Sequence, residues 1–255
     1  MKKFYINSFG FKIIAVITMF IDHIGVLLKP IISYNIYRIF RCIGRIAFPL
    51  FCFMLVEGFR YSKDRFKYLR NLFIFALISE IPSDLFFRSL YTMNDELSIF
   101  STLFIGLLSI ILIDRIQKKC VKQNESIIST ILITFIVIGS LFLGDLIKVE
   151  YGWTGILLIL MIYIFQNNFV LARKKINNER MLRNIFICIS IVIWAILYDL
   201  YYGRVIELYA IISGVMVLFY NGERGSYKIS KWVFYAFYPL HLIILILLRD
   251  LVVFG

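Results

Sequence analysis

Nine apolar segments recur along the chain, each separated from the next by a polar stretch, and this repetition constrains the fold more than any other feature. A helix that crosses about 30 Å of hydrocarbon needs roughly 20 predominantly apolar residues. Most of the segments approach that length, so they predict membrane-spanning helices. The fifth and eighth segments are short, and the turn at residues 201–204 between the seventh and eighth is tight, so eight helices with one re-entrant hairpin remain an alternative. The segments cover about residues 11–29, 39–58, 69–87, 97–114, 127–143, 152–169, 185–201, 205–220 and 232–249.

Composition agrees with a membrane protein rather than a soluble domain. Hydrophobic residues make up 61% of the 255 positions, against roughly 45–50% in soluble globular domains. No soluble domain or internal repeat remains once the apolar segments are marked. We therefore predict one integral-membrane domain over residues 1–255, folded as an all-α transmembrane bundle of about nine helices.

The positions of Lys and Arg predict the orientation of the chain. Cytoplasmic loops of membrane proteins carry an excess of these residues. The bias predicts a cytoplasmic N-terminus, and it explains the net charge of +12 without a nucleic-acid partner. Seven of the 28 basic residues fall on one side of the predicted bundle, whereas twenty fall on the other, within residues 2–12, 60–70, 115–122, 173–183 and 224–231.

Ionisable side chains inside the apolar segments are the candidates for function. Such a residue costs roughly 2.5–3.5 kcal/mol on insertion scales, so it normally faces a bundle interior or a wet cavity. Neighbouring helical residues point about 100° apart, so the adjacent Asp22 and His23 each need a partner from another helix. The candidates at mid-depth or nearer the outer side are Asp22, His23, Arg45, Glu80, Asp84 and His241.

The pairing of these residues has alternative interpretations. Arg45 is the expected cation for Asp22, Glu80 or Asp84, because the last two lie one helical turn apart and would repel each other. A purely structural ion network is one interpretation, and a functional site is the other. The two histidines, His23 and His241, are either neutral groups bonded between helices or general bases. Two histidines alone make a poor metal site, so we predict no metal.

A basic stretch follows the second apolar segment. It is first a topology signal, and binding of a phosphorylated cofactor such as coenzyme A is the second interpretation. The candidate cofactor-binding residues are Arg60, Lys63, Arg65, Lys67 and Arg70.

Five blocks carry a resemblance to a known family: KIIAVITMFIDHIG at 12–25, GRIAFPLFCFMLVEG at 44–58, YLRNLFIFALISEIPSD at 68–84, EYGWTG at 150–155 and FYPLH at 237–241. In these blocks the chain resembles the TraX family of conjugal-transfer pilin acetylation proteins. The resemblance implies a multi-pass acetyltransferase of the bacterial cytoplasmic membrane. Such an enzyme would move an acetyl group from cytoplasmic acetyl-CoA to an extracytoplasmic acceptor, either a peptide or pilin N-terminal amine or a glycan hydroxyl.

The resemblance and the candidate residues together give an expected mechanism. His23 or His241 deprotonates the acceptor, and Arg45 pairs with carboxylates or stabilises developing negative charge. The three candidate carboxylates orient these groups. Two alternatives remain at this stage: a proton- or cation-coupled transporter that uses the same buried charges, and a non-catalytic assembly factor.

Overall fold

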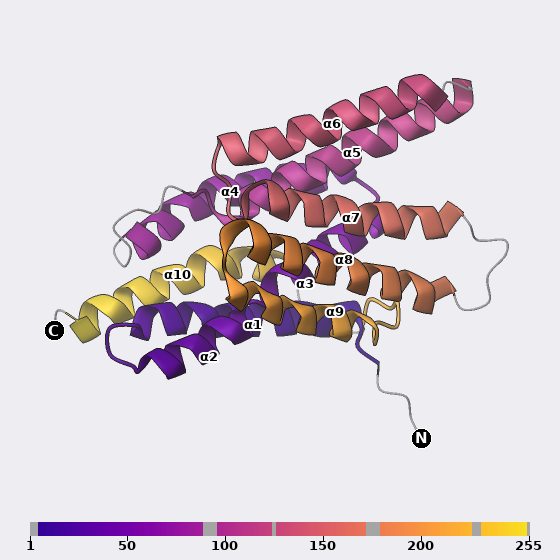
Figure 1. The fold of residues 1–255 in the computed structure, drawn as a ribbon. Helices are drawn as coiled ribbons and strands as arrows, with labels where there is room; N and C mark the ends of the chain where they lie inside the picture. The colour runs from indigo at the N-terminus through magenta and orange to yellow at the C-terminus, as the bar shows by residue number, and fades with distance from the viewer. Residues whose placement is uncertain (1–4, 89–95, 124–125, 172–178, 226–230, 254–255) are drawn as a thin grey trace.

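The computed structural model describes residues 5–88, 96–123, 126–171, 179–225 and 231–253. Within these ranges the chain is helical apart from turns and two isolated β-bridges, which confirms the predicted all-α bundle (Figure 1). The helices are α1 (Ser8–Leu28), α2 (Tyr34–Gly44), α3 (Ala47–Tyr61), α4 (Arg65–Arg88), α5 (Ile99–Gln123), α6 (Ser126–Leu146), α7 (Gly152–Leu171), α8 (Glu179–Tyr202), the 3-10 helix η1 (Val205–Ala210), α9 (Ile211–Val217) and α10 (Lys231–Val253).

Successive passages run in opposite directions along the bundle (Figure 1). With α2 and α3 counted as one passage, and η1 and α9 as another, the described helices match the nine predicted segments. We call the end at which α1 begins and α3 ends the basic end, because the predicted basic stretches fall there, and the other the opposite end. Among the described residues, six helical stretches are long and apolar enough to cross a membrane, as a multi-pass protein requires: Ser8–Leu28, Tyr34–Tyr61, Ile99–Cys120, Ile127–Leu146, Glu179–Tyr202 and Trp232–Asp250.

The second predicted segment departs from expectation. A single helix over 39–58 is wrong, because the structure begins it at Tyr34 and interrupts it at Arg45 and Ile46, between α2 and α3. Pro49 explains the interruption: proline has no N–H for the carbonyl four residues earlier, and its ring clashes with that carbonyl, which belongs to Arg45. The break places the Arg45 side chain at a helix end rather than within a regular span.

The eighth segment is shorter than a full span. The six residues of η1 and the seven of α9 extend about 22 Å at the rises of 3-10 and α-helices, less than the roughly 30 Å of a hydrocarbon core. The pair lies against α8. The length of this pair fits the alternative of eight helices and one re-entrant hairpin better than a ninth full span.

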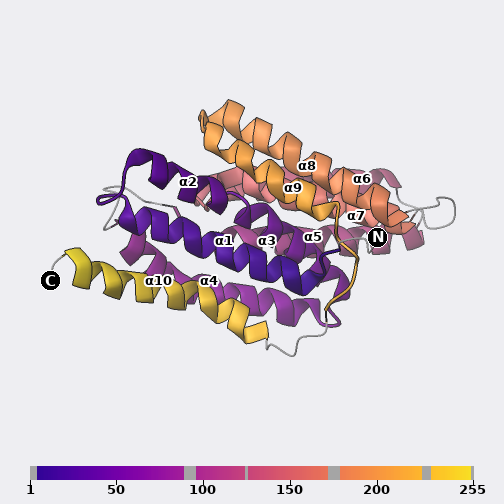
Figure 2. The same cartoon turned by 90° about the horizontal axis from the view of Figure 1, so that it is seen from below.

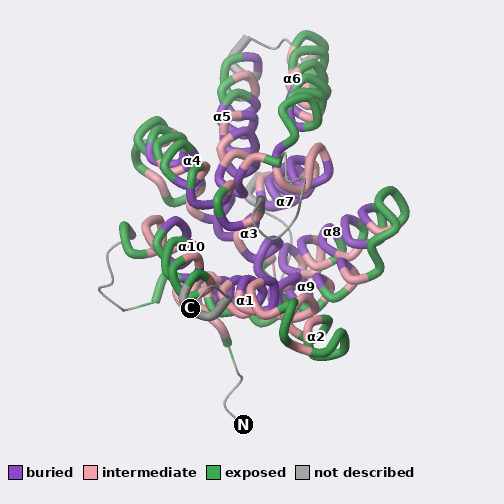
Figure 3. The backbone as a smooth tube through the Cα atoms, turned by 90° about the vertical axis from the view of Figure 1, so that its left-hand side faces the viewer, coloured by how far each residue is buried: buried purple, intermediate pink, exposed green. Residues whose placement is uncertain are grey.

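The core of the bundle lies around α3. Eleven of its fifteen residues are buried, and it contacts α1, α5 and α7. Figure 3 shows α3 in the middle of the view along the bundle, with α6 and α2 at the periphery. On one side of α3, α10 lies beside both α1 and α4 (Figure 2). This arrangement brings α1, α3, α4 and α10 around one space.

Each end of the bundle has a short parallel backbone pairing. At the basic end Ile6 pairs with Tyr220, and at the opposite end Leu97 pairs with Val149. The second pairing includes a hydrogen bond from the Glu150 N–H to the Leu97 carbonyl at 3.0 Å. The pairing therefore holds the turn before α7, which contains Glu150 and Tyr151, against the segment before α5.

Candidate functional site

A buried ion network joins four parts of the chain in the half of the bundle nearer the opposite end. Arg45 donates from Nη2 to Asp22 Oδ2 at 3.0 Å and from Nη1 to Glu207 Oε1 at 2.5 Å. Arg41 Nη1 donates to the same Asp22 oxygen at 2.6 Å, and Arg45 Nη1 lies 3.3 Å from the Tyr151 hydroxyl. Two guanidinium groups thus face two carboxylates, so the formal charges of the network cancel, as a buried cluster requires.

Close approach of two helices makes this network. A Cβ atom added to Gly44 would lie 2.1 Å from Asp22 Oδ1, so only glycine lets the carboxylate lie directly against the backbone of α2. Asp22 Oδ1 and Glu207 Oε2 have no hydrogen-bond partner within the described residues. Each carboxylate therefore depends on arginine through its other oxygen.

The turn before α7 adds a titratable group beside the network. Tyr151 has φ of 63°, a conformation that non-glycine residues adopt rarely and that often marks a functional constraint. Its ring stacks on Phe48 at 3.9 Å between centroids. Burial raises the pKa of the neighbouring Glu150 carboxyl to about 8, and the carboxylate of Glu96 contributes to the rise. Glu150 is therefore protonated at neutral pH, which leaves the charge balance of the network undisturbed.

The two histidines meet each other on the other side of α1. His23 Nδ1 and His241 Nε2 lie 2.6 Å apart, and the two rings are nearly parallel, with centroids 4.9 Å apart. His241 Nδ1 lies 2.8 Å from the Phe237 carbonyl oxygen. Asp22 and His23 therefore face different partners, one towards α2 and η1 and the other towards α10.

With both imidazoles taken as neutral, these contacts assign their tautomers. A carbonyl oxygen only accepts hydrogen bonds, so His241 donates from Nδ1 to Phe237 and its Nε2 carries a lone pair. His23 must then donate from Nδ1 to that lone pair, and its own Nε2 is left unprotonated. His23 Nε2 has no hydrogen-bond partner within the described residues. Of the two rings, His23 is thus the one that can accept a proton from another molecule.

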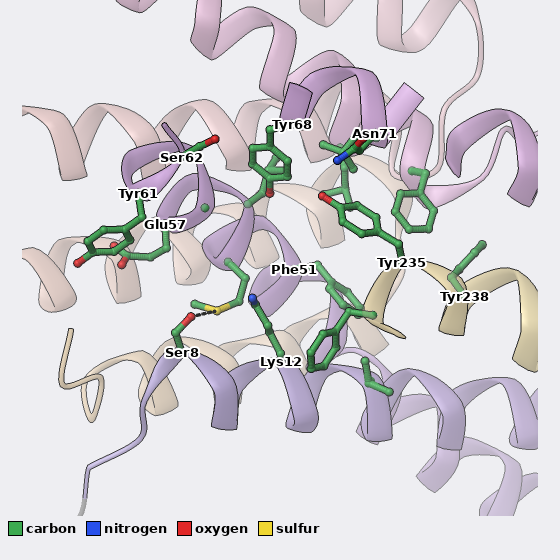
Figure 4. Close-up of a pocket in the computed structure, with 18 of the residues that line it drawn as sticks. Ser8, Lys12, Phe51, Glu57, Tyr61, Ser62, Tyr68, Asn71, Tyr235 and Tyr238 are labelled. Atoms are coloured by element: carbon green, nitrogen blue, oxygen red, sulfur yellow. Dashed lines mark hydrogen bonds between the residues drawn. The ribbon is translucent and has the colours of Figure 1, made fainter. Parts of the chain in front are cut away.

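A pocket of about 410 Å³ opens on the same group of helices (Figure 4). Along α1 its lining runs from Ser8 to Met19, about 16 Å at 1.5 Å per residue. Towards the basic end it is lined by three cations, Lys12, Lys67 and Arg224, and by two carboxylates, Glu57 and Asp64. The pocket therefore combines a charged region with an excess of one positive charge at the basic end and a long, mainly apolar interior.

Tyr238 connects this pocket with the histidine pair. It lines the pocket, and its ring centroid lies 6.3 Å from that of His23 and 5.6 Å from that of His241. Neither histidine is itself part of the lining. The imidazoles therefore contact a residue of the pocket lining without belonging to the lining themselves.

The other two predicted site residues lie apart from these groups. Glu80 accepts a hydrogen bond from the backbone N–H of Ser98 at 3.1 Å, so it links α4 to the start of α5, where the helix dipole favours a carboxylate. Asp84 lies one turn further along α4 and is partly buried. Of the three carboxylates considered for Arg45, Asp22 pairs with it, whereas no Arg45 contact with Glu80 or Asp84 occurs among the described ion pairs.

The five predicted cofactor-binding residues occupy different environments. Lys67 alone among them lines the pocket. Arg65 pairs with Asp114 of α5, and Arg60 Nη1 lies 3.9 Å from Glu57 Oε1. Lys63 and Arg70 are exposed.

Several residues of the site escaped the sequence analysis. Glu207 and Tyr151 were not among the candidates, although an acid near an apolar segment and an aromatic in the EYGWTG block were visible signals. The pocket cations Lys12 and Arg224 belong to basic stretches that, in the sequence, indicate only the orientation of the chain in the membrane. Tyr238 lies within the FYPLH block, yet tyrosine is too common here, at 16 residues, to single it out.

Comparisons with known proteins agree with the resemblance. A family profile described as "TraX protein" matches residues 10–249. The chain is 40% identical over 74 residues to the "Probable fimbrial assembly protein FimC, serogroup H1" of Dichelobacter nodosus, covering 29% of this chain and 30% of that protein. It is 38% identical over 89 residues to the "Uncharacterized protein RP591" of Rickettsia prowazekii (strain Madrid E), covering 35% of this chain and 32% of that protein.

These two matches are partial, because the chain spans about a third of the length of the curated relatives it matches. No solved structure matches the chain.

Proposed function

The chain belongs to the TraX protein family, and we propose on that basis that it is a membrane-embedded acetyltransferase. It would take acetyl-CoA from the basic end of the bundle and transfer the acetyl group to an acceptor that reaches the site from the opposite end. The observation that carries the proposal is the pocket that extends from three cations to Tyr238, whose ring contacts the paired histidines.

The pocket has the chemistry that the donor needs. Phosphate groups bind to cationic side chains, which Lys12, Lys67 and Arg224 supply at the basic end. A pantetheine arm is a flexible, mainly apolar chain, and the interior beyond these cations is lined by residues such as Met19, Leu72 and Phe100. The thioester would lie at the far end, beside Tyr238.

The histidine pair supplies a base at that end. His23 Nε2 would accept the proton of the acceptor N–H or O–H while the acceptor atom attacks the thioester carbonyl carbon. Collapse of the tetrahedral intermediate re-forms the C=O bond and breaks the C–S bond, and the thiolate leaves with the proton returned by His23. His241 touches neither reactant in this scheme. It is a positioning residue that holds the His23 tautomer through the 2.6 Å contact.

Arg45 has a structural role in this proposal. All three of its guanidinium nitrogens already have partners: Nη1 and Nη2 in the ion network and Nε at the Arg41 carbonyl, 3.3 Å away. Of the two expected roles, pairing with carboxylates therefore has the support of the geometry. A donor for the developing oxyanion has to come from elsewhere.

The acceptor class follows from the relatives. The Dichelobacter nodosus protein is named a probable fimbrial assembly protein, and the family name points in the same direction. We therefore propose the N-terminal amine of a fimbrial or pilus subunit as the first acceptor to test, and a glycan hydroxyl as the second. The bacterial cytoplasmic membrane, with the basic end in the cytoplasm, is the location that fits this route.

The test is transfer from labelled acetyl-CoA by the purified protein in liposomes, with a synthetic peptide that has a free N-terminal amine as the acceptor probe. His23→Ala should lower kcat about 10²- to 10⁴-fold, the usual contribution of a general base. His241→Gln should retain more activity than His241→Ala, because the amide oxygen can still accept from His23 Nδ1. If His23→Ala leaves the rate of CoA release unchanged, the acetyltransferase proposal is wrong. A transporter or a non-catalytic assembly factor predicts no enzymatic release of CoA at all.

Two lysines close in the sequence provide a matched test of the donor site. Lys67 lines the pocket, whereas Lys63 is exposed and is not part of the lining. Lys67→Gln should raise KM for acetyl-CoA about tenfold, since a charge-assisted hydrogen bond contributes roughly 1.5–3 kcal/mol. Lys63→Gln should leave KM unchanged. Equal effects of the two substitutions would place the donor outside this pocket.

A further inference from the structure

Tyr238 has a buried hydroxyl group without a partner. The residue is 4% exposed, and its oxygen makes no hydrogen bond within the described part of the chain. It lies near the Ser83 side chain and the backbone of Ile99, but not in hydrogen-bonding geometry. An unpaired buried donor costs roughly 1–3 kcal/mol, so such a group calls for a functional explanation.

The position of this hydroxyl is informative. Tyr238 both lines the pocket and places its ring against the two imidazoles. The other pocket tyrosines have different neighbours: the ring of Tyr235, for example, stacks on Phe75 at 5.1 Å. Tyr238 is therefore the pocket tyrosine that lies next to the proposed base and also faces the site proposed for the donor.

The start of α5 lies at the same end of the pocket. Its first two residues, Ile99 and Phe100, belong to the lining, and the Phe100 ring lies edge-on to that of Tyr238, with centroids 5.4 Å apart. A helix N-terminus carries partial positive charge and favours a negative group nearby. The Glu80 carboxylate already accepts a hydrogen bond from Ser98 at this helix start. An oxyanion at the same end of the pocket therefore needs a neutral donor of its own, and the Tyr238 O–H is such a donor.

We infer that Tyr238 is a further catalytic residue, whose hydroxyl donates a hydrogen bond to the thioester carbonyl oxygen of the acetyl donor as that oxygen becomes an oxyanion. The inference rests on the proposed acetyltransferase function. When the acceptor attacks, the π electrons of the C=O bond move to oxygen, which accepts the hydrogen bond without taking the proton. When the C=O bond re-forms and the C–S bond breaks, that hydrogen bond weakens again.

Burial makes this donor effective. The Tyr238 oxygen has no hydrogen bond within the described residues that would have to be broken first, so a hydrogen bond gained in the transition state is a net gain. Arg45, the alternative donor, has all three guanidinium nitrogens engaged. The two groups therefore have different roles: His23 accepts the proton of the acceptor, and Tyr238 stabilises the negative charge on the thioester oxygen.

The test compares Tyr238→Phe with Tyr163→Phe in the acetyl-CoA and peptide assay described above. Both substitutions remove one hydroxyl from a buried tyrosine and keep the ring, but Tyr163 lies in α7 and is not part of the pocket lining. Tyr238→Phe should lower kcat about 10²- to 10³-fold, the loss typical of one oxyanion donor, with KM for acetyl-CoA unchanged. Tyr163→Phe should stay close to the wild type in both constants.

The outcomes separate the inference from the function on which it rests. If His23→Ala abolishes transfer but Tyr238→Phe retains the wild-type kcat, the acetyltransferase proposal stands and the role of Tyr238 is wrong. The same conclusion follows if Tyr238→Phe changes KM and kcat together, or if Tyr163→Phe loses as much activity. If wild type and His23→Ala release CoA equally, both proposals fail. A variant that is unstable in detergent would be assayed in native membranes, with the rate divided by the amount of folded protein.

Discussion

Removal of Arg45 from the ion network should be far more costly than its removal together with Glu207. Arg45→Met leaves Glu207, which is 0% exposed, without its one described ion-pair partner. The network then holds two carboxylates against the single guanidinium of Arg41. Glu207→Met creates the reverse imbalance, two guanidinium groups against Asp22. The double variant retains the Arg41–Asp22 pair and is again balanced.

The expected magnitudes follow from this charge count. Breaking a buried ion pair by removing one partner costs roughly 3–5 kcal/mol, whereas replacing both partners by apolar residues of similar volume is often neutral. For a chain of this length, 1 kcal/mol corresponds to about 2–4 °C in Tm. Each single substitution should therefore lower Tm by roughly 6–20 °C, and the double substitution should lower it by less than either one.

Thermal unfolding of the four proteins in one detergent, at one scan rate, measures this double-mutant cycle. Coupling appears as a double variant that is more stable than the sum of the two singles predicts. The matched control is Arg38→Met, which removes an exposed arginine of α2 and should change Tm little. If the stability changes of the two single variants simply add up in the double variant, Arg45 and Glu207 do not belong to one charge-balanced unit.

Two further predictions concern the surroundings of the network. Gly44→Ala should lower Tm markedly, since its Cβ would lie 2.1 Å from Asp22 Oδ1. The control is Gly139→Ala in α6, whose Cβ meets nothing within 4 Å and which should leave Tm unchanged or slightly raised. Equal effects of the two substitutions would contradict the close packing of α1 on α2. Burial raises the pKa of Glu150 to about 8, so its contribution to stability is complete below the unfolded pKa of about 4.5 and is lost as the pH rises through about 8. Tm of the wild type should consequently fall more steeply than that of Glu150→Gln between pH 6 and pH 9. The difference should correspond to about 1 kcal/mol of unfolding free energy, after a discount for the partial exposure of Glu150. Parallel curves of Tm against pH would refute the raised pKa of Glu150.

The spans were predictable because they depend on local composition. A run of apolar residues of membrane length is helical wherever it lies in the fold, and the predicted segment at 185–201 lies within α8. The break at Arg45 was also within reach, since Pro49 removes the hydrogen bond to the Arg45 carbonyl. A prediction from average hydropathy does not detect such a break, so it treats α2 and α3 as one helix.

The partners of the buried charges were not predictable, because they depend on which helices become neighbours. Glu207 lies 162 positions from Arg45, and nothing in either local sequence indicates the contact. Glu80 and Asp84 lie one turn apart on a single helix, a pattern that indicates a shared cation. Glu80 instead accepts a hydrogen bond from the backbone N–H of Ser98 at the start of α5. Local spacing identified groups that need partners, whereas the packing of α1 against α2 and η1 decided which partners they have.

The ion network and the histidine pair are connected through α1. Successive residues of an α-helix point about 100° apart, so the contacts that hold Asp22 at 2.6 Å from Arg41 and 3.0 Å from Arg45 also fix the rotation of α1 that turns His23 towards His241. Asp22 is thus a positioning residue for the base. Asp22→Asn should lower kcat with KM for acetyl-CoA unchanged, and by less than His23→Ala, because α1 gains rotational freedom without losing the imidazole. A loss of binding instead of turnover would show that Asp22 acts on the pocket rather than on His23.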